Sequence, residues 1–292
     1  MNQKPVKIGN FELFTVETGR FMLDGGAMFG VVPKTLWSRK IPADDKNRIP
    51  MAARCLLIKS SATGKIYLID TGCGDKFDEK MSSIYGLDFE HSNLDDSLDK
   101  LGVKKSDITD IIFTHLHFDH CGGTTSFNES GEPELNFKNA TFHVNERHWQ
   151  TATNPNEREK ASFFSENLDP IKNSGKLNLV QDRHKFEEGL STIPADGHTI
   201  GQQLPFIYDD KISLIYTADL IPTAAHVPLP WIMGYDMSPV QTLKEKAVFL
   251  DEAADNEWYL YLEHDAEHEV VQITAENKRH SVKNSLNFSD LT

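Results

Sequence analysis

Cysteine is scarce in this sequence, and long apolar runs are absent from it. The three cysteines, Cys55, Cys73 and Cys121, are scattered and odd in number, which is not the pattern of a disulfide framework. No run approaches the length that a helix needs to cross a bilayer, so we expect no membrane partner. The first residues, Met-Asn-Gln-Lys-Pro, lack the basic start, apolar core and cleavage site of a secretion signal. Together these absences predict a cytoplasmic protein.

Positive charge is also in deficit. The 292 residues include 30 lysines and arginines against 44 acidic residues, a formal net charge of −14 at pH 7. This charge disfavours tight contact with a phosphate backbone, so we expect no nucleic-acid partner. Length alone suggests about two domains. However, no repeat, low-complexity run or linker divides the chain, and we predict one domain over residues 1–292.

The most informative stretch of the chain is residues 111–123. An apolar strand at 111–113 leads into a loop that carries His115, His117, Asp119 and His120, followed by two glycines. Imidazole nitrogen and carboxylate oxygen suit zinc and similar divalent ions. In an extended segment residues i and i+2 share a face, so His115, His117 and Asp119 can point one way while His120 starts a second direction. A chance polar loop is the alternative, but this spacing indicates ligands divided between two adjacent ions.

The segment Thr-His-Leu-His-Phe-Asp-His-Cys-Gly-Gly, residues 114–123, resembles the His-x-His-x-Asp-His signature of metallo-β-lactamase-fold hydrolases. The resemblance implies an α/β (α+β) fold, a four-layer αβ/βα sandwich with the metal site at one edge. It also implies a cofactor of two divalent metal ions, with Zn²⁺ expected. Cys121 adjoins the ligands and could touch a metal, although a small buried side chain that packs the loop is the favoured interpretation.

Other segments extend the resemblance along the chain. Gly-His-Thr-x-Gly at 197–201 matches the family's third ligand segment, Ala-Asp at 218–219 ends a strand, and Glu-His-Asp at 263–265 ends the last one. The resemblance implies that one ion is bound by His115, His117 and His198, that the other is bound by Asp119, His120 and His264, and that Asp219 bridges them. Asp70, in an Asp-x-Gly at a strand end, is expected to orient the metal loop; the alternative is a cap on the next turn.

Hydrophobic period and turn residues predict the secondary structure around these motifs. Strands are expected at 11–14, 20–23, 53–59, 65–70, 110–113, 141–144, 190–194, 203–208, 212–217 and 258–262, and helices at 94–101, 146–152, 157–164 and 240–254. The first two strands are expected to form a hairpin that turns at 17–19. His143 and His148 lack ligand spacing to a partner, so we expect packing or surface roles for both.

Residues 24–37 are apolar and rich in glycine but show neither helical nor strand period. We interpret this segment as an irregular cover over a pocket or a partner subunit, which allows a homodimer; the alternative is a loop folded onto its own core. Together with 226–228 and 233–236, it resembles the bacterial quorum-quenching lactonase branch, which opens N-acyl-homoserine lactones. The predicted substrate-binding residues are Met28, Phe29 and Trp37 of the apolar segment, and His226, which follows Asp219 closely enough to line a pocket.

The resemblance also implies a mechanism, in which a metal-bridging hydroxide attacks the lactone carbonyl. Asp119 would orient this hydroxide and pass a proton to the leaving oxygen. Several lactonases of this fold carry a tyrosine three residues after the bridging aspartate, but here that position is Pro222. Tyr235 is our candidate for the missing phenol, and the alternative is that the site has none. The predicted catalytic set is Asp119, Asp219 and Tyr235.

Four other classes compete with a lactonase. An organophosphate or aryl ester hydrolase of the same fold would share every ligand and differ only in its pocket. An RNA-processing member should have a basic groove, which the net charge of −14 disfavours. A non-catalytic scaffold should have lost ligands, and all seven positions are filled here. Di-iron redox members usually carry a glutamate in the motif and a flavin domain, and neither is present.

Overall fold

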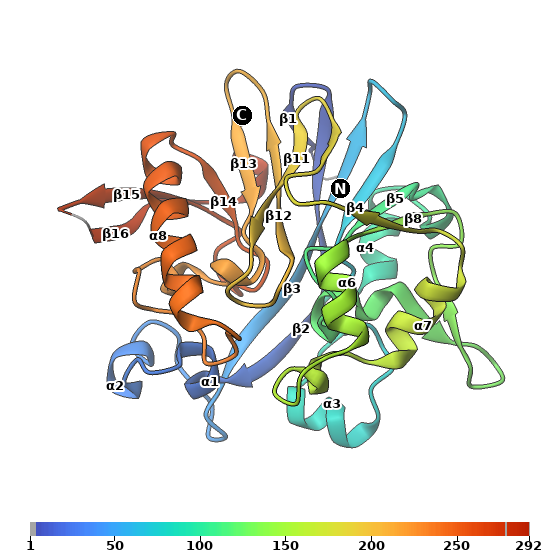
Figure 1. The fold of residues 1–292 in the computed structure, drawn as a ribbon, viewed down its shortest axis with the longest axis horizontal. Helices are drawn as coiled ribbons and strands as arrows, with labels where there is room; N and C mark the ends of the chain where they lie inside the picture. The colour runs from blue at the N-terminus through green and yellow to red at the C-terminus, as the bar shows by residue number, and fades with distance from the viewer. Residues whose placement is uncertain (1–3, 278, 292) are drawn as a thin grey trace.

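Two large β-sheets form the centre of the molecule. The computed structural model describes residues 4–277 and 279–291, and within them each large sheet has seven strands (Figure 1). The first sheet runs in the order β1 (Val6–Ile8), β2 (Phe11–Asp24), β3 (Arg48–Ser60), β4 (Ile66–Ile69), β5 (Asp110–Ile112), β8 (Thr141–Asn145) and β9 (Leu177–Val180). The second runs in the order β10 (Lys185–Glu187), β11 (Leu190–Ala195), β12 (Gln202–Tyr208), β13 (Ser213–Tyr216), β14 (Tyr259–Tyr261), β15 (Val270–Glu276) and β16 (Arg279–Leu286).

Both sheets mix parallel and antiparallel pairs. In the first sheet β4, β5, β8 and β9 are parallel, and in the second β13 and β14 are parallel. A parallel pair requires a crossover, and helices supply it here. A small third sheet pairs β6 (Thr125–Phe127) with β7 (Pro133–Leu135).

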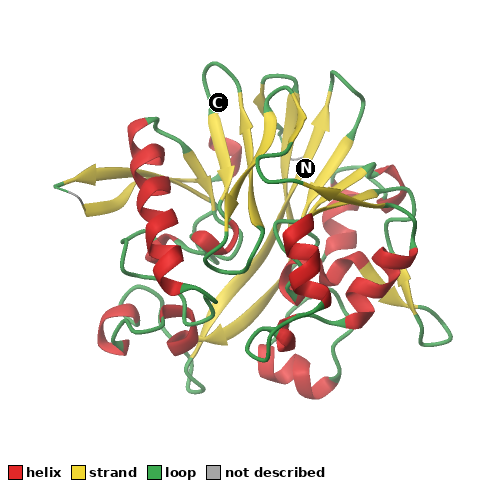
Figure 2. Ribbon diagram, in the orientation of Figure 1, coloured by secondary structure: helices red, strands yellow, loops and turns green. Residues whose placement is uncertain are grey.

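Helices cover the outer faces of the two sheets (Figure 2). On the first sheet lie α4 (Leu94–Lys100), α6 (Glu146–Thr153) and α7 (Ser165–Asn173), whose side chains Leu98, Ala152 and Ile171 share a buried cluster with Ile111 and Phe142. On the second lies α8 (Pro239–Asp255), which begins with proline and buries Phe249 and Leu250. The order helix, sheet, sheet, helix is the predicted four-layer α/β sandwich, which is confirmed.

The main core lies between the sheets. Leu56, Ile69 and Ile112 of the first sheet share one buried cluster with Leu214 and Leu260 of the second. Each such side chain contributes roughly 1.5–3 kcal/mol when it leaves water. Cys121 is buried in the apolar cluster between the first sheet and its helices, which also contains Ile111 and Phe142. This position agrees with the interpretation of Cys121 as a packing residue. In the described part of the chain no helix combines the length and the apolar character that a membrane span requires.

The predicted hairpin at 17–19 is wrong, because β2 continues through it from Phe11 to Asp24. The strand pairs with β3 along its length, and the register shifts between Glu17 and Arg20. Gly19 has a φ of +140°, and the hydroxyl of Thr18 donates a hydrogen bond to the carbonyl of Ala53. Residues 17–20 therefore form a β-bulge, which bends a strand without ending it.

The predicted helix at 157–164 is also wrong. Its residues form a 3₁₀ turn, η3 (Lys160–Ser162), and the helix α7 begins only at Ser165. The side chain of Asn156 accepts hydrogen bonds from the backbone N–H groups of Arg158 and Glu159, a local bond that competes with helix formation. The structure adds α3 (Glu79–Tyr85), β1, β6, β7, β9, β10, β15 and β16, which the sequence pattern does not predict.

Residues 24–37 are not irregular but contain two short helices. Asp24 caps α1 (Gly25–Phe29) by accepting a hydrogen bond from the backbone of Ala27, and α2 (Lys34–Trp37) follows. Each helix is too short to establish a period in the sequence. Val31, between the two helices, is 93% exposed, and Leu36, within α2, is 47% exposed. A subunit interface at this segment stays a prediction.

The remaining short elements are 3₁₀ turns and one helix at the ligand loop. They are η1 (Lys105–Asp107), α5 (Phe118–Cys121), η2 (Gly122–Thr124), η4 (Ala218–Leu220), η5 (Ala224–His226) and η6 (Phe288–Asp290).

A close backbone contact beside residues 114–123 should contribute to the stability of the fold. Gly74 has a φ of +69°, and a Cβ there would lie 2.3 Å from the carbonyl oxygen of Gly122, whereas Gly102 has a φ of +64° and open space around it. Both Gly→Ala substitutions incur about 1–2 kcal/mol for the left-handed backbone. Gly74→Ala should lose a further ~1–3 kcal/mol because the two loops must separate. Urea unfolding of both variants measures the difference; equal losses would contradict the contact.

Candidate metal centre

The predicted ligands come from four chain segments at one edge of the two sheets. His115 and His117 follow β5, Asp119 and His120 belong to α5, and His198 follows β11. Asp219 lies in η4 after β13, and His264 follows β14. All seven side chains are buried. The strand ends therefore deliver nitrogen and oxygen donors from both sheets to one enclosed place.

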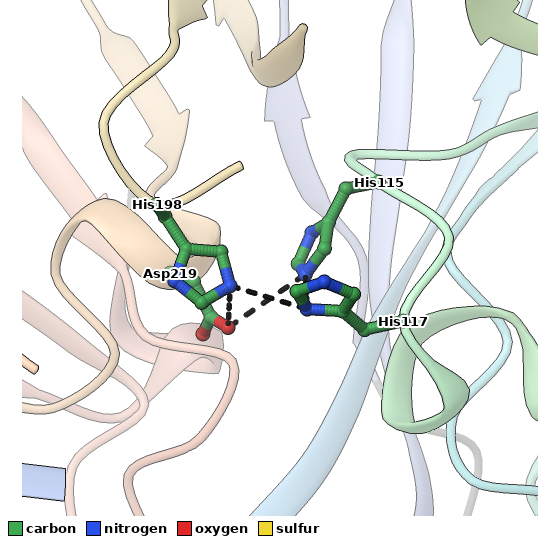
Figure 3. Close-up of side chains that lie close together, drawn as sticks. All are labelled: His115, His117, His198 and Asp219. Carbon is green, nitrogen blue, oxygen red and sulfur yellow. Dashed lines mark hydrogen bonds and ion pairs between the residues drawn. The ribbon is translucent and has the colours of Figure 1, made fainter. Parts of the chain in front are cut away.

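A first cluster contains His115, His117, His198 and Asp219 (Figure 3). Nε2 of His115 lies 3.0 Å from Nδ1 of His117, which lies 3.2 Å from Nε2 of His198. Oδ2 of Asp219 lies 3.0 Å from the same nitrogen of His198. The four ligand atoms all lie within 4.8 Å of one another. Three nitrogens and one oxygen at this spacing fit a tetrahedral cation such as zinc.

A second cluster contains Asp119, His120 and His264. Nε2 of His264 lies 3.1 Å from Nε2 of His120, and Oδ2 of Asp119 lies 3.7 Å from His264 and 3.9 Å from His120. This set also has the donor types of a zinc site, with one position fewer filled. Its three donors leave a fourth position, which an oxygen of Asp219 also faces.

Asp219 lies between the two clusters. Its Oδ2 faces His198, and its Oδ1 lies 3.3 Å from Nε2 of His264. Among the described residues Oδ1 has no hydrogen-bond partner, although it is buried. A buried carboxylate oxygen without a donor is costly. The arrangement fits a carboxylate that would be shared by two cations.

The outward-facing ring nitrogens of these histidines meet acceptors. The pairs are His117 with Oε1 of Glu159 at 3.2 Å, His198 with Oδ1 of Asp236 at 3.1 Å, and His264 with the carbonyl of Ala52 at 2.9 Å. Each acceptor fixes the ring's tautomer and orientation, so the opposite nitrogen presents its lone pair to the cluster.

His120 is held by two carboxylates. Its Nδ1 lies 3.1 Å from Oδ2 of Asp70 and 3.2 Å from Oε2 of Glu263. Asp70 also accepts hydrogen bonds from the backbone and hydroxyl of Thr114, at 2.8 and 2.7 Å. Burial and the neighbouring Glu263 raise the pKa of Asp70 to about 7. Its bonds reach a loop 44 residues away, so this side chain orients the ligand loop, as predicted, and does not cap the next turn.

The electrostatics of the site favour positive charge. Burial alone would lower the histidine pKa values, but the carboxylates of Asp219 and Asp236 raise the pKa of His198 to about 10. Burial also opposes ionisation of Asp219, yet His198 and His264 hold its pKa well below the ordinary value. Burial and the adjacent imidazoles lower the pKa of His115, which keeps that ring neutral. The negative field that holds a proton on His198 would equally favour a cation in its place, and the neutral ring of His115 offers a free lone pair.

A cavity of about 410 Å³ opens onto the clusters. Its floor includes His117, Asp119, His198, Asp219 and His264. Its walls are mostly apolar, formed by Leu23, Ala27, Met28, Phe118, Ala161, Met233 and Met237, with Tyr85, Arg158, Glu159, Ser162 and Tyr235 as polar exceptions. This combination of apolar walls and a polar floor is typical of a small-molecule site.

The structure brings some predicted substrate residues to the cavity and leaves others behind its wall. Met28 and Tyr235 line it. Phe29, Trp37 and His226 do not: Phe29 is fully buried between the rings of Trp37 and His226, at 5.3 and 4.5 Å. The imidazole of His226 donates to the carbonyl of Met28 at 2.9 Å. These three side chains support the wall that Met28 presents.

Several functional candidates are absent from the sequence prediction. Glu159 and Asp236 orient ligand histidines, and Tyr85 and Arg158 line the cavity. Each lies far in sequence from the residue that it serves, so no local spacing reveals the pair. One sequence signal could have found Asp236 and Glu263, because Asp236 follows Tyr235 and Glu263 precedes His264.

Comparison with known proteins agrees with this geometry. The profile of the metallo-beta-lactamase superfamily matches residues 48–264. A probable metal-dependent hydrolase from Staphylococcus aureus superposes with a TM-score of 0.87 at 28% identity, covering 98% of this chain and 100% of that one. AidC, a dizinc quorum-quenching lactonase in complex with a product, superposes with a TM-score of 0.79 at 24% identity, covering 97% and 98%.

A third structure is more distant. It is a variant of AiiA from B. thuringiensis with N-decanoyl-L-homoserine bound at the active site, with a TM-score of 0.65 at 20% identity, covering 90% of this chain and 95% of that one. The profile match spans well over half of the chain and includes every predicted ligand. This chain belongs to the metallo-beta-lactamase superfamily and is a hydrolase of that fold.

Proposed function

We propose that this protein is a dinuclear metal hydrolase that opens lactone rings, with N-acyl-homoserine lactones as its substrates. The observation that carries the proposal is the position of Asp219, whose carboxylate lies 3.0 Å from His198 of the first donor cluster and 3.3 Å from His264 of the second, at the floor of an apolar cavity. Two adjacent cations are the arrangement that activates water for hydrolysis. The apolar walls suit an acyl chain.

His115, His117 and His198 would hold one ion, Asp119, His120 and His264 would hold the other, and Asp219 would bridge them. When bound, the ions would supply the acidity that makes water a nucleophile near neutral pH and the charge that polarises a carbonyl. The mixed imidazole and carboxylate set favours Zn²⁺.

The chain's own residues would complete the reaction. Asp119 lies on the cavity floor, where its carboxylate can orient the attacking water, take up its proton and return that proton to the ring oxygen as the carbon–oxygen bond breaks. Tyr235 lines the same cavity. Burial raises the pKa of its phenol, so the hydroxyl stays protonated and can donate a hydrogen bond to the substrate carbonyl.

The substrate itself tests the proposal. The kcat/KM of zinc-loaded enzyme should be highest for N-acyl-homoserine lactones when compared with an aryl ester and a phosphotriester. The reason is that the apolar walls contact the acyl chain, and each buried methylene contributes about 0.8 kcal/mol, so two more carbons should raise kcat/KM by roughly tenfold until the cavity is full. A clear preference for the phosphotriester or aryl ester would reject the lactonase assignment.

Metal content tests the centre. Elemental analysis of the unsubstituted chain should find about two ions, because seven ligands exceed what one tetrahedral zinc accepts. Asp119→Ala should retain about one ion, whereas Asp219→Ala should weaken both sites. Since loss of an outer-shell partner alone costs about 10–100-fold, Asp219→Ala should lower hydrolysis by more than about 100-fold. Two ions with near-normal turnover in Asp219→Ala would show that this residue is not the bridge.

A matched pair of methionines tests the cavity wall. Met28 and Met51 are both buried in one cluster, but only Met28 lines the cavity. Either Met→Ala change should cost about 2–5 kcal/mol of stability. Only Met28→Ala should flatten the dependence of kcat/KM on acyl length, because only that change removes contact with the chain. The same flattening in Met51→Ala would mean that packing, not contact with substrate, sets the preference.

A further inference from the structure

A single buried histidine joins the two loops that carry the first ligand cluster. His148 lies in α6, is fully buried and uses both ring nitrogens. Its Nε2 accepts a hydrogen bond from the backbone N–H of Leu116 at 2.7 Å, and its Nδ1 donates to the carbonyl of Ile200 at 2.9 Å. Leu116 stands between His115 and His117, and Ile200 is two residues beyond His198.

The bond to Leu116 acts on the peptide that links two ligands. Leu116 is fully buried, and its N–H points to His148 as its hydrogen-bond partner. A buried N–H without a partner is rare and unfavourable, so this loop conformation depends on an acceptor at that point. The sulfhydryl of Cys121 donates to the carbonyl of the same residue at 3.3 Å. Both backbone polar groups of Leu116, its N–H and its carbonyl, are therefore satisfied.

The start of α6 holds the second loop as well. Arg147 donates to Oδ2 of Asp196 at 2.8 Å, and Oδ1 of Asp196 accepts from the backbone of Gly201 at 2.8 Å. A Cβ at Gly201 would lie 2.6 Å from the backbone nitrogen of His148, so this loop sits directly against the helix. Residues 196–201, which present His198, are thus attached to α6 on both sides of that ligand.

We propose that His148 is a positioning residue that sets the separation between the His115–His117 pair and His198, and through it the affinity of the first cluster for a cation. His117 and His198 are 81 residues apart in sequence and follow strands of different sheets. One rigid imidazole, bonded to both loops, fixes their distance more tightly than packing alone can. Burial lowers the pKa of His148 to about 3, so the ring is neutral and keeps one acceptor and one donor.

Zinc affinity in single-site backgrounds tests this role. The inference rests on the proposed metal centre, but not on the lactone as substrate. His264→Ala leaves the first cluster intact, and His198→Ala leaves Asp119, His120 and its partner His264. In the His264→Ala background His148→Phe should weaken Zn²⁺ binding by about 10–100-fold, measured by competition with a chromophoric chelator. In the His198→Ala background the same change should leave affinity within about twofold, because the second cluster does not use the link between the loops.

A milder variant and a matched control sharpen the test. His148→Asn keeps a donor for Ile200 but has no acceptor that reaches Leu116, so it should weaken the first cluster by about tenfold even where the phenylalanine variant does not fold. His143 is the control, because it is also buried and also makes two hydrogen bonds, to Oδ1 of Asp110 and from Asn178, both at 2.8 Å. His143→Asn should lower stability without a change in the Zn²⁺ affinity of either cluster.

Two results would overturn the inference in different ways. Unchanged affinity of the first cluster in His148→Asn, or equal weakening of both clusters, would show that His148 only stabilises the fold. A complete lack of Zn²⁺ binding by the unsubstituted chain would remove the proposed metal centre together with this inference.

Discussion

Seven buried donor side chains meet at one place, and the rest of the structure is arranged to hold them there. Imidazole nitrogens approach one another to 3.0–3.2 Å, a spacing at which their lone pairs repel unless a proton or a cation lies between them. Burial of so many polar groups is unfavourable without partners. The structure offsets this with carboxylates and carbonyls on the outer ring nitrogens, which orient each donor before any ion arrives. The site is thus preorganised at the expense of local stability.

This arrangement explains why the ligands stand at strand ends. A strand inside a packed sheet has little freedom, so the first residues beyond it have well-defined positions. β5, β11, β13 and β14 each deliver ligands in this way, and the cluster of Leu56, Ile69 and Leu260 between the sheets keeps those ends aligned. The cavity walls have a different origin, because most of them come from the end of β2, from α1, from α3 and from loops. Phe118, beside Asp119 in α5, is the exception. The donors and most of the cavity wall are therefore carried by separate parts of the chain.

The sequence singles out all seven side chains of the two clusters and one of their supports, Asp70, but not the other supports. The spacing from His115 to His120 is typical of a metal site. Its resemblance to the metallo-β-lactamase signature extends along the chain to His198, Asp219 and His264. Glu159 and Asp236 act on histidines that are 42 and 38 residues away, and only the folded chain brings each pair together. The bulge near Gly19 was interpreted as a turn, because a glycine within an apolar pattern can mark either a bulge inside one strand or a turn between two.

The sequence analysis predicted that Phe29 and Trp37 bind substrate, but neither lines the cavity. An apolar segment near a pocket can contact substrate or support the residues that do, and composition does not separate these roles. Phe29 and Trp37 proved to be fully buried behind Met28. Short helices such as α1 are similarly invisible, since fewer than two turns establish no period.

The division of the first cluster between the two sheets has a consequence for folding. His115 and His117 follow a strand of the first sheet, whereas His198 and Asp219 follow strands of the second, so neither half of the chain can form this cluster alone. A cation at this cluster would therefore bind only after the halves have docked, and it would then link them. An ion at a thousandfold excess over its Kd adds about 4 kcal/mol to the docked state. Such a late contact slows unfolding much more than it speeds folding, so metal supply would govern how long the native protein persists.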